Sequence, residues 1–500
     1  MLNNFPILTI LVFLPLAGAL LLVPVWKREA WMRRLALGAG LVEFALAAWL
    51  TVQWQAFQQA PGAPPGFLLW ADFPWIGRFG IRYTVGMDGI SLLMVLLTAF
   101  ITVIALLVSW NAIKERVALH YCLILVMASG IMGVFLSLDL FLFYLFWEVM
   151  LVPMFLLIGI WGHGRRIYSA VKFFLYTMFG SLLMLLAIIG VYLIHGGETG
   201  SYTFALPALV QTQMAPQTAC WLFAAFLLAF AIKVPLFPLH TWLPDAHTDA
   251  PTAGSVVLAG LLLKTGAYGI IRFGYPLFPA AAASFAPFLT VLAVTGIVYG
   301  SWVAYAQTDM KRLVAYSSVG HMGFVALGIA AWTPVSLSGS MLQMVNHGVT
   351  TGALFALVGM LDERAATREI GAFGGLWGKV PLFAAFFLLF SMASAGLPGL
   401  NNFAGEFIIL AGSFKALPGA VVIAFIGIIL PLVYTIKLVQ QLLFVTERQP
   451  LAMNDLSLRE GAILAVLAAA AVYLGVHPVP LLDLLKAPIT LLTSGAGGMP

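Results

Sequence analysis

The sequence predicts an all-α integral membrane protein with about fourteen transmembrane helices. Hydrophobic residues make up 62% of the 500 residues and charged residues only 9%, whereas soluble proteins carry roughly 25% charged residues. The mean hydropathy is +1.03, and apolar runs near the ~20 residues that span a bilayer recur along the whole chain. Most of these runs lack the polar stripe of a soluble helix, which disfavours a soluble helical core.

The apolar runs place the expected helices in chain order. In the first half they are predicted at about 5–25, 33–56, 87–110, 117–136, 138–159, 169–194 and 217–247. In the second half they are predicted at about 255–273, 283–306, 313–331, 335–361, 380–415, 419–445 and 459–485. The start of the chain has no basic segment and no small-residue cleavage site, which favours a retained first helix over a signal peptide.

Two of the predicted helices are expected to be interrupted. Pro235 and Pro238 break the helix at 217–247 directly after Lys233, and Gly396, Pro398 and Gly399 break the helix at 380–415 shortly before Glu406. Irregular backbone at membrane depth is tolerated only where protein or a wet cavity surrounds it. Broken helices in corresponding halves of a chain indicate a transporter-like site.

These breaks suggest an internal repeat. Five-helix blocks at 117–273 and 283–445 correspond, and an odd number of helices per block inverts the second block in the membrane. The predicted organisation is therefore N-terminal helices (1–116), two inverted repeats, and a C-terminal helix and tail (446–500).

Basic residues gather on alternate loops, and this bias sets the orientation of membrane proteins. One side is expected to carry sixteen Lys and Arg residues and the other side five. Because the richer side faces the cytoplasm and the number of helices is even, both termini are predicted on the non-cytoplasmic side.

Ionisable residues inside the predicted spans are the candidate functional residues, because each costs at least ~2.5–3.5 kcal/mol at the bilayer centre. The candidates are Glu43, Glu148, Lys233, His240, Lys264, His321, His347, Glu406 and Lys437. A buried Glu148 needs a cation from another helix, and Lys233 or Lys264 can supply it. Such a pair can be switched by a nearby charge or can be purely structural. Lys437 can snorkel to the membrane surface, and Glu43 has no partner in its own helix.

Redox chemistry within this chain is disfavoured. Cys122 and Cys220 show no ligand spacing, so neither a cluster nor another metal site is expected. His321 and His347 could relay protons, hydrogen-bond in the core or bind one haem. No second histidine pair exists to carry electrons across the membrane. We therefore expect ion movement and no cofactor in this chain.

Several motifs resemble the antiporter-like membrane chains of respiratory complex I, the proton-translocating NADH:quinone oxidoreductase. The resemblance covers nearly the whole chain and is carried by residues 146–154, 233–247, 250–264, 316–323, 346–348 and 402–407. The string from Lys233 to His247, KVPLFPLHTWLPDAH, is the most specific of these motifs. Glu406 favours the chain M type, because sister chains and sodium/proton antiporters usually carry lysine there.

The resemblance also implies roles for single residues. Glu148 would be the coupling carboxylate that pairs with Lys233, and Lys264 would be the central proton carrier. His321 and His347 would extend the polar axis, and Glu406 would be its terminal carboxylate. His240 is a further candidate site residue. No family role is known for Glu43.

At the level of the whole assembly, the resemblance implies a multi-pass subunit of a bacterial plasma (inner) membrane that moves protons. FMN, iron–sulfur clusters and quinone are expected in partner subunits, which would supply the redox energy. Neighbouring antiporter-like chains on both sides and a lateral helix from one of them are the expected partners, and no nucleic acid is expected. The alternatives are a subunit of a multisubunit sodium/proton antiporter, a membrane scaffold and an electron carrier.

Overall fold

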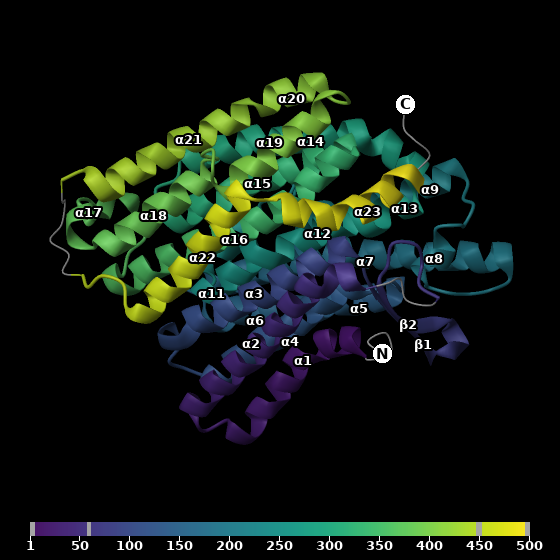
Figure 1. Ribbon diagram of the computed structural model, residues 1–500, viewed down its shortest axis with the longest axis horizontal. Helices are drawn as coiled ribbons and strands as arrows, with labels where there is room; N and C mark the ends of the chain where they lie inside the picture. The colour runs from purple at the N-terminus through teal and green to yellow at the C-terminus, as the bar shows by residue number, and fades with distance from the viewer. Residues whose placement is uncertain (1–5, 58–61, 447–452, 496–500) are drawn as a thin grey trace.

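The computed structural model describes residues 6–57, 62–446 and 453–495 and forms an elongated bundle of helices (Figure 1). Among these residues, 13 helices are long and apolar enough to cross a membrane. The broken helix formed by α18 (Pro381–Ser394) and α19 (Asn401–Phe414) completes the predicted set. The predicted all-α membrane fold is therefore confirmed.

The helices of the first half follow the predicted order. They are α1 (Ile7–Leu22), α2 (Glu29–Gln53), α3 (Gly89–Ala112), α4 (Val117–Leu136), α5 (Leu140–Val149), α6 (Leu151–Trp161), α7 (Arg166–Thr199), α8 (Leu206–Leu209), α9 (Pro216–Lys233) and α10 (Trp242–Asp249). The split between α5 and α6 falls at Met150, three residues before Pro153, which cannot donate a helical hydrogen bond.

The second half contains more irregular helices. Its α-helices are α11 (Thr252–Val257), α12 (Leu263–Gly269), α13 (Tyr275–Leu277), α14 (Pro279–Tyr305), α15 (Met310–Ala331), α16 (Pro334–Ala365), α17 (Leu376–Lys379), α18, α19, α20 (Pro418–Ala424), α21 (Ile426–Val439), α22 (Leu458–Val476) and α23 (Val479–Gly495). Within the described residues, three π-helical segments interrupt this order: η5 (Leu258–Leu262), η6 (Ile270–Gly274) and η8 (Gln440–Phe444).

Two features differ from the sequence prediction. The segment before α3 forms an antiparallel hairpin of β1 (Leu69–Ile76) and β2 (Ile81–Met87), which was not predicted. Arg82 binds Asp72 across this hairpin at 2.7 Å. Burial raises the pKa of Asp72, but hydrogen bonds from Arg82 and Thr84 outweigh this effect and hold the pKa below its ordinary value.

The last predicted helix, 459–485, was wrong in its extent. The structure ends α22 at Val476 and begins a separate helix, α23, at Val479. The residue before a proline is disfavoured in helical conformation, and His477, which precedes Pro478, leaves the helix with φ −135° and ψ 64°. Helix α23 then packs on α16 and α3. Helices α22 and α23 are the yellow pair in Figure 1.

Helix α16 lies at the centre of the bundle. It contacts α3, α11, α15, α18, α19, α22 and α23. Both α16 and the segment Thr252–Leu277 are buried along the whole of their most apolar stretch. The polar side chains within these two stretches are therefore shielded from lipid and from bulk water.

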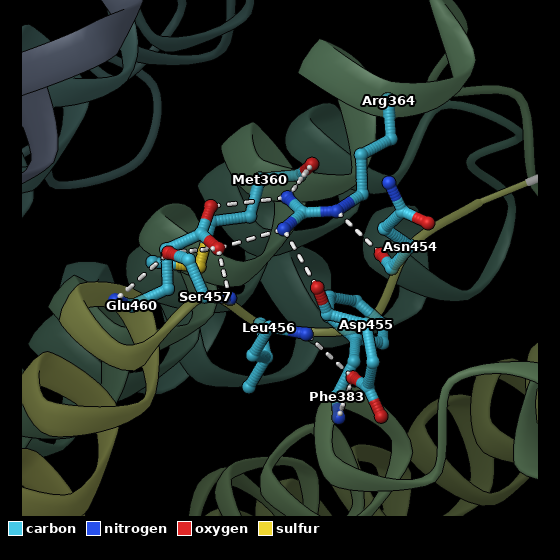
Figure 2. A network of polar contacts seen from close by, with 8 residues as sticks. All are labelled: Met360, Arg364, Phe383, Asn454, Asp455, Leu456, Ser457 and Glu460. Atoms are coloured by element: carbon cyan, nitrogen blue, oxygen red, sulfur yellow. Dashed lines mark hydrogen bonds and ion pairs between the residues drawn. The ribbon is translucent and has the colours of Figure 1, made fainter.

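Arg364, in the last turn of α16, fastens the C-terminal helices to the bundle (Figure 2). Its guanidinium donates to both carboxylate oxygens of Glu460, at 2.7 and 3.1 Å. It also donates to the backbone carbonyl of Asn454 at 2.9 Å. The Asp455 carboxylate accepts from the backbone N–H of Phe383 at 3.0 Å, which ties α18 to the same network.

Candidate functional site

Both predicted helix breaks are present, and each is stabilised locally. Helix α9 ends at Lys233, and the indole of Trp242, the first residue of α10, donates to the carbonyl of Ile232 at 2.9 Å. In the second break, Gly396 (φ +77°) and Gly399 (φ +92°) adopt a left-handed backbone conformation that glycine tolerates best.

Lys233 lies at the first break and is only 1% exposed. Its Nζ makes no hydrogen bond within the described part of the chain and lies 5.4 Å from the ring centroid of Trp147 and 5.5 Å from that of Phe173. Such cation–π contacts partly offset the lost hydration of a cation. Glu148 is near enough for its charge to act on Lys233, although no direct ion pair joins them.

Helix α12, which carries Lys264, packs against this break. A side chain added at Gly266 would meet the Cβ of Lys233 at 3.0 Å, so α12 packs directly on the end of α9. Lys264 lies between η5 and η6, and π-helical turns of this kind occur often at functional sites.

Lys264 joins the two halves of the chain. Its Nζ lies 2.6 Å from Nδ1 of His347 on α16 and also donates to the carbonyl of Ala259. Both side chains are fully buried. The lysine therefore has a titratable partner at hydrogen-bond distance.

A second buried pair lies on the far side of His347. Nδ1 of His321 lies 2.7 Å from Oε1 of Glu406, and the Gln343 amide donates to the same oxygen at 3.1 Å. The rings of His321 and His347 have centroids 5.8 Å apart. Glu406 is 3% exposed and points into the bundle. The structure thus connects Lys264, His347, His321 and Glu406 through neighbouring side chains, while Glu148 and Lys233 lie at the end of α9 on which α12 packs. We call these six residues the buried row.

The structure does not bring His240 into this row. Its ring lies 5.2 Å from the ring of Tyr299 and 5.7 Å from that of Phe237, and it makes no hydrogen bond to another described residue. Lys437 lies apart as well, with its Nζ 4.0 Å from the ring centroid of Tyr305. Glu43 is fully buried on α2, where neither carboxylate oxygen has a partner among the described residues.

Two residues near the row were not among the predicted candidates. His247 is fully buried on α10 and stacks on Phe355 with ring centroids 4.5 Å apart. The charges of both Lys311 and Lys264 act on it. Lys311 was assigned to a loop, but it is 4% exposed and donates to the carbonyl of Ala250. The motif from Lys233 to His247 was the signal that could have identified this histidine.

A cavity of about 650 Å³ reaches Lys311 from the face that carries the basic loops. Its lining includes Lys114, His163, Asp362 and Arg368. Burial lowers the pKa of His163, and the charges of Lys311 and Arg368 lower it further. The His163 imidazole at the cavity wall therefore favours its neutral form more than an ordinary histidine does.

The fold and the row together define a class: multi-pass membrane proteins with buried ionisable residues at the breaks of two interrupted helices, as in ion transporters. Residues 137–431 match the family model described as "NADH:quinone oxidoreductase/Mrp antiporter, TM". The chain belongs to this family.

Relatives of known name agree with this assignment. The chain is 46% identical over 460 residues to the NADH-quinone oxidoreductase subunit M of Pseudomonas aeruginosa, covering 91% of this chain and 90% of that protein. It is 43% identical over 491 residues to the subunit M of Escherichia coli strain K12, covering 95% of each.

Solved structures show the same fold. A chain of the respiratory complex I from Thermus thermophilus superposes with a TM-score of 0.85 at 34% identity, covering 97% of this chain and 99% of that one. A chain of the Mrp complex from Dietzia sp. superposes with a TM-score of 0.82 at 20% identity, over 99% of this chain and 100% of that one, and this likeness concerns the fold alone.

Proposed function

We propose that this chain is the M-type membrane subunit of an NADH:quinone oxidoreductase and that it translocates protons. The near full-length identity to proteins named subunit M supports the assignment. The observation that carries the proton-transfer role is the contact of Lys264 with His347, which joins the two halves of the buried row.

The proposed route runs from Glu148 through Lys233 and Lys264 to His347, His321 and Glu406. Lysine, histidine and carboxylate side chains can each bind and release a proton, as a relay requires. Apart from Glu148, which is partly exposed, every member of the row is buried and shielded from bulk water.

The Glu148–Lys233 separation supports an electrostatic switch. A unit charge about 4 Å away at an effective dielectric of ~20 is worth roughly 4 kcal/mol. Because Glu148 acts on Lys233 without a direct hydrogen bond, a small displacement of either group changes the stability of the lysine's charge. Lys233 would then pass its proton toward Lys264 when Glu148 moves away or is neutralised.

Protons would enter through the cavity that ends at Lys311. His247 is near enough to Lys311 and to Lys264 for both charges to act on it, and its two ring nitrogens have no partner among the described residues. It is therefore positioned to connect the cavity with the centre of the row.

The remaining features of the assembly follow from the same assignment. The basic loops would face the cytoplasm of a bacterium and both termini the opposite side of the inner membrane. Helices 4–8 (117–273) and 9–13 (283–445) would form the two inverted repeats. Neighbouring antiporter-like chains would bind on both sides, together with a lateral helix of one of them. FMN, iron–sulfur clusters and quinone would reside in partner subunits.

Affinity purification of the chain from its own membrane, followed by reconstitution of the complex in sodium-free vesicles, tests the assignment. We expect flavin and iron–sulfur subunits to copurify and NADH oxidation to acidify the vesicles without sodium. Copurification of antiporter subunits alone, with proton movement that requires sodium, would instead support the sodium/proton antiporter.

A further inference from the structure

The row of titratable residues has a gap between His347 and the pair of His321 and Glu406. Both ring nitrogens of His321 are occupied, Nδ1 by Glu406 at 2.7 Å and Nε2 by the Ser394 hydroxyl at 3.3 Å. His347 uses Nδ1 for Lys264, and its Nε2 has no partner among the described residues. A proton that reaches His347 therefore has no direct hydrogen bond to follow toward Glu406.

The packing of α16 against α19 shows what lies at this gap. Gln343 contacts Glu406, while Asn346 and Asn401 exchange hydrogen bonds of 2.6 and 3.0 Å between their side-chain amides and backbone carbonyls. Along α16 the contacts run forward from Gln343 to Asn346, while along α19 they run back from Glu406 to Asn401. The two helices are therefore antiparallel.

This register places Asn402 opposite His347. Residues four apart lie on the same face of a helix. His347 therefore shares a face of α16 with Gln343, and Asn402 shares a face of α19 with Glu406. In an antiparallel pair, the step from Gln343 to His347 corresponds to the step from Glu406 back to Asn402. Asn402 therefore lies one helical turn from Glu406, at the level of His347 on the facing helix.

Asn402 has unused hydrogen-bonding capacity in this position. The residue is fully buried, and neither Oδ1 nor Nδ2 has a partner in the described ranges. Oε1 of Gln343 and Oδ1 of Asn346, both on the facing helix, are equally unpaired. A buried amide without hydrogen bonds costs about 1–3 kcal/mol, and such groups normally bind another group or a water. A buried water needs two to four polar partners, and this gap offers that number.

We propose that Asn402 is a positioning residue that holds water between His347 Nε2 and the Glu406 carboxylate. The water accepts a proton from Nε2 of protonated His347 and releases another of its protons to Glu406. It is unchanged at the end, and the net transfer is one proton from the imidazolium to the carboxylate. This proposal rests on the proposed function and adds the step that closes the row.

The test compares two substitutions in vesicles that contain the whole complex. Asn402→Leu removes the amide that binds the water and fills its space with an apolar side chain. Proton translocation should then fall by roughly an order of magnitude or more, because a positioned proton-transfer step contributes ~10²–10⁴-fold. Asn402→Ser retains a hydroxyl that can hold water and should recover most of the loss. Native gels should show normal assembly of both variants, because the native amide makes no hydrogen bond to another described residue.

Ser413→Ala is the matched control. Ser413 is also fully buried on α19 without a hydrogen-bond partner among the described residues, but it lies about three helical turns from Asn402. Its substitution should leave pumping unchanged. If Asn402→Leu does not assemble, the smaller and equally apolar Asn402→Val carries the same expectation.

Full pumping in the leucine variant, or a serine variant as impaired as the leucine one, would overturn the role of Asn402. Lys264→Ala, measured in the same vesicles, separates this outcome from failure of the proposed function. If Lys264→Ala is inactive while Asn402→Leu pumps normally, only the water site is wrong. If Lys264→Ala pumps normally, the row itself is not the route.

Discussion

Lys264 and His347 lie 83 positions apart in the sequence, yet their side chains meet at 2.6 Å in the centre of the bundle. Lys264 comes from the irregular segment α11–α13 and His347 from the central helix α16. The two residues are fully buried, so each provides the polar environment of the other. This contact links residues from two halves of the chain within the buried row.

Lys264→Arg should abolish most proton translocation although it conserves the charge. Arginine stays protonated at any accessible pH, whereas a relay must release its proton. A pH-sensitive dye in vesicles with the whole complex would report the loss. Lys437→Arg is the control, because Lys437 contacts Tyr305 away from the row and its substitution should leave pumping unchanged. Full turnover of the Lys264 variant would mean that this lysine supplies only a fixed charge.

Glu148→Gln should be nearly as damaging as Glu148→Ala, whereas Glu148→Asp should keep part of the activity. Glutamine has the shape of glutamate but lacks the charge that acts on Lys233. NADH-driven proton uptake, normalised to the amount of assembled complex, would rank the three variants. Unimpaired pumping by Glu148→Gln would show that Glu148 acts through hydrogen bonds and not through its charge.

Lys233→Met should stop pumping while the complex assembles normally. The lysine Nζ makes no hydrogen bond that the substitution would remove within the described protein, and methionine can occupy the space beside Trp147 and Phe173. An ammonium group that is buried without a hydrogen bond is costly to keep away from water, so an apolar side chain of similar volume removes this cost. Lys233→Ala should have the same functional effect. Assembly follows from native gels and pumping from the dye, and normal pumping would remove Lys233 from the route.

Arg364→Ala should weaken attachment of the C-terminal helices but spare the chemistry of the row. The substitution removes the two hydrogen bonds to Glu460, and charged hydrogen bonds are worth roughly 1.5–3 kcal/mol each when partly buried. The complex should therefore melt at a lower temperature, with normal pumping per assembled complex. The exposed pair of Arg33 and Glu29 offers a comparison, because surface pairs contribute only ~0–1 kcal/mol. Equal effects of Arg364→Ala and Glu29→Gln would contradict this account of the network in Figure 2.

Sequence alone could predict the spans, the two breaks and most of the row. Charged residues are rare at membrane depth, so Glu148, Lys233 and Lys264 stand out against their apolar neighbours without structural information. The prolines after Lys233 and the glycines before Glu406 mark the breaks for the same local reason.

The position of the histidines could not be predicted in this way. His240 lies inside the break, and the helical phase restarts at Trp242, so counting residues from Lys233 does not tell which way its ring points. The structure turns His240 toward Tyr299 and places His247, in the next helix, near Lys264. Only tertiary packing decides between these two residues.

Lys311 was misplaced for a related reason. A lysine at the start of a helix, beside Arg312, has the pattern of a solvated loop end, and the orientation rule counts it as such. Its burial depends on how α15 packs against the segment at Ala250. The β1–β2 hairpin was not predicted because it lies between membrane spans. Long apolar runs reveal the spans, but they do not reveal the alternation of side chains that indicates a strand.

The most direct test of the buried row is the ratio of protons translocated to electrons transferred in two histidine variants. His347→Leu interrupts the row beside Lys264, whereas His240→Leu changes an equally buried histidine outside it. NADH oxidation by an artificial acceptor would confirm that both complexes are intact. The account predicts a strongly reduced ratio for His347→Leu and an unchanged ratio for His240→Leu. An unchanged ratio for His347→Leu in intact complex would contradict it.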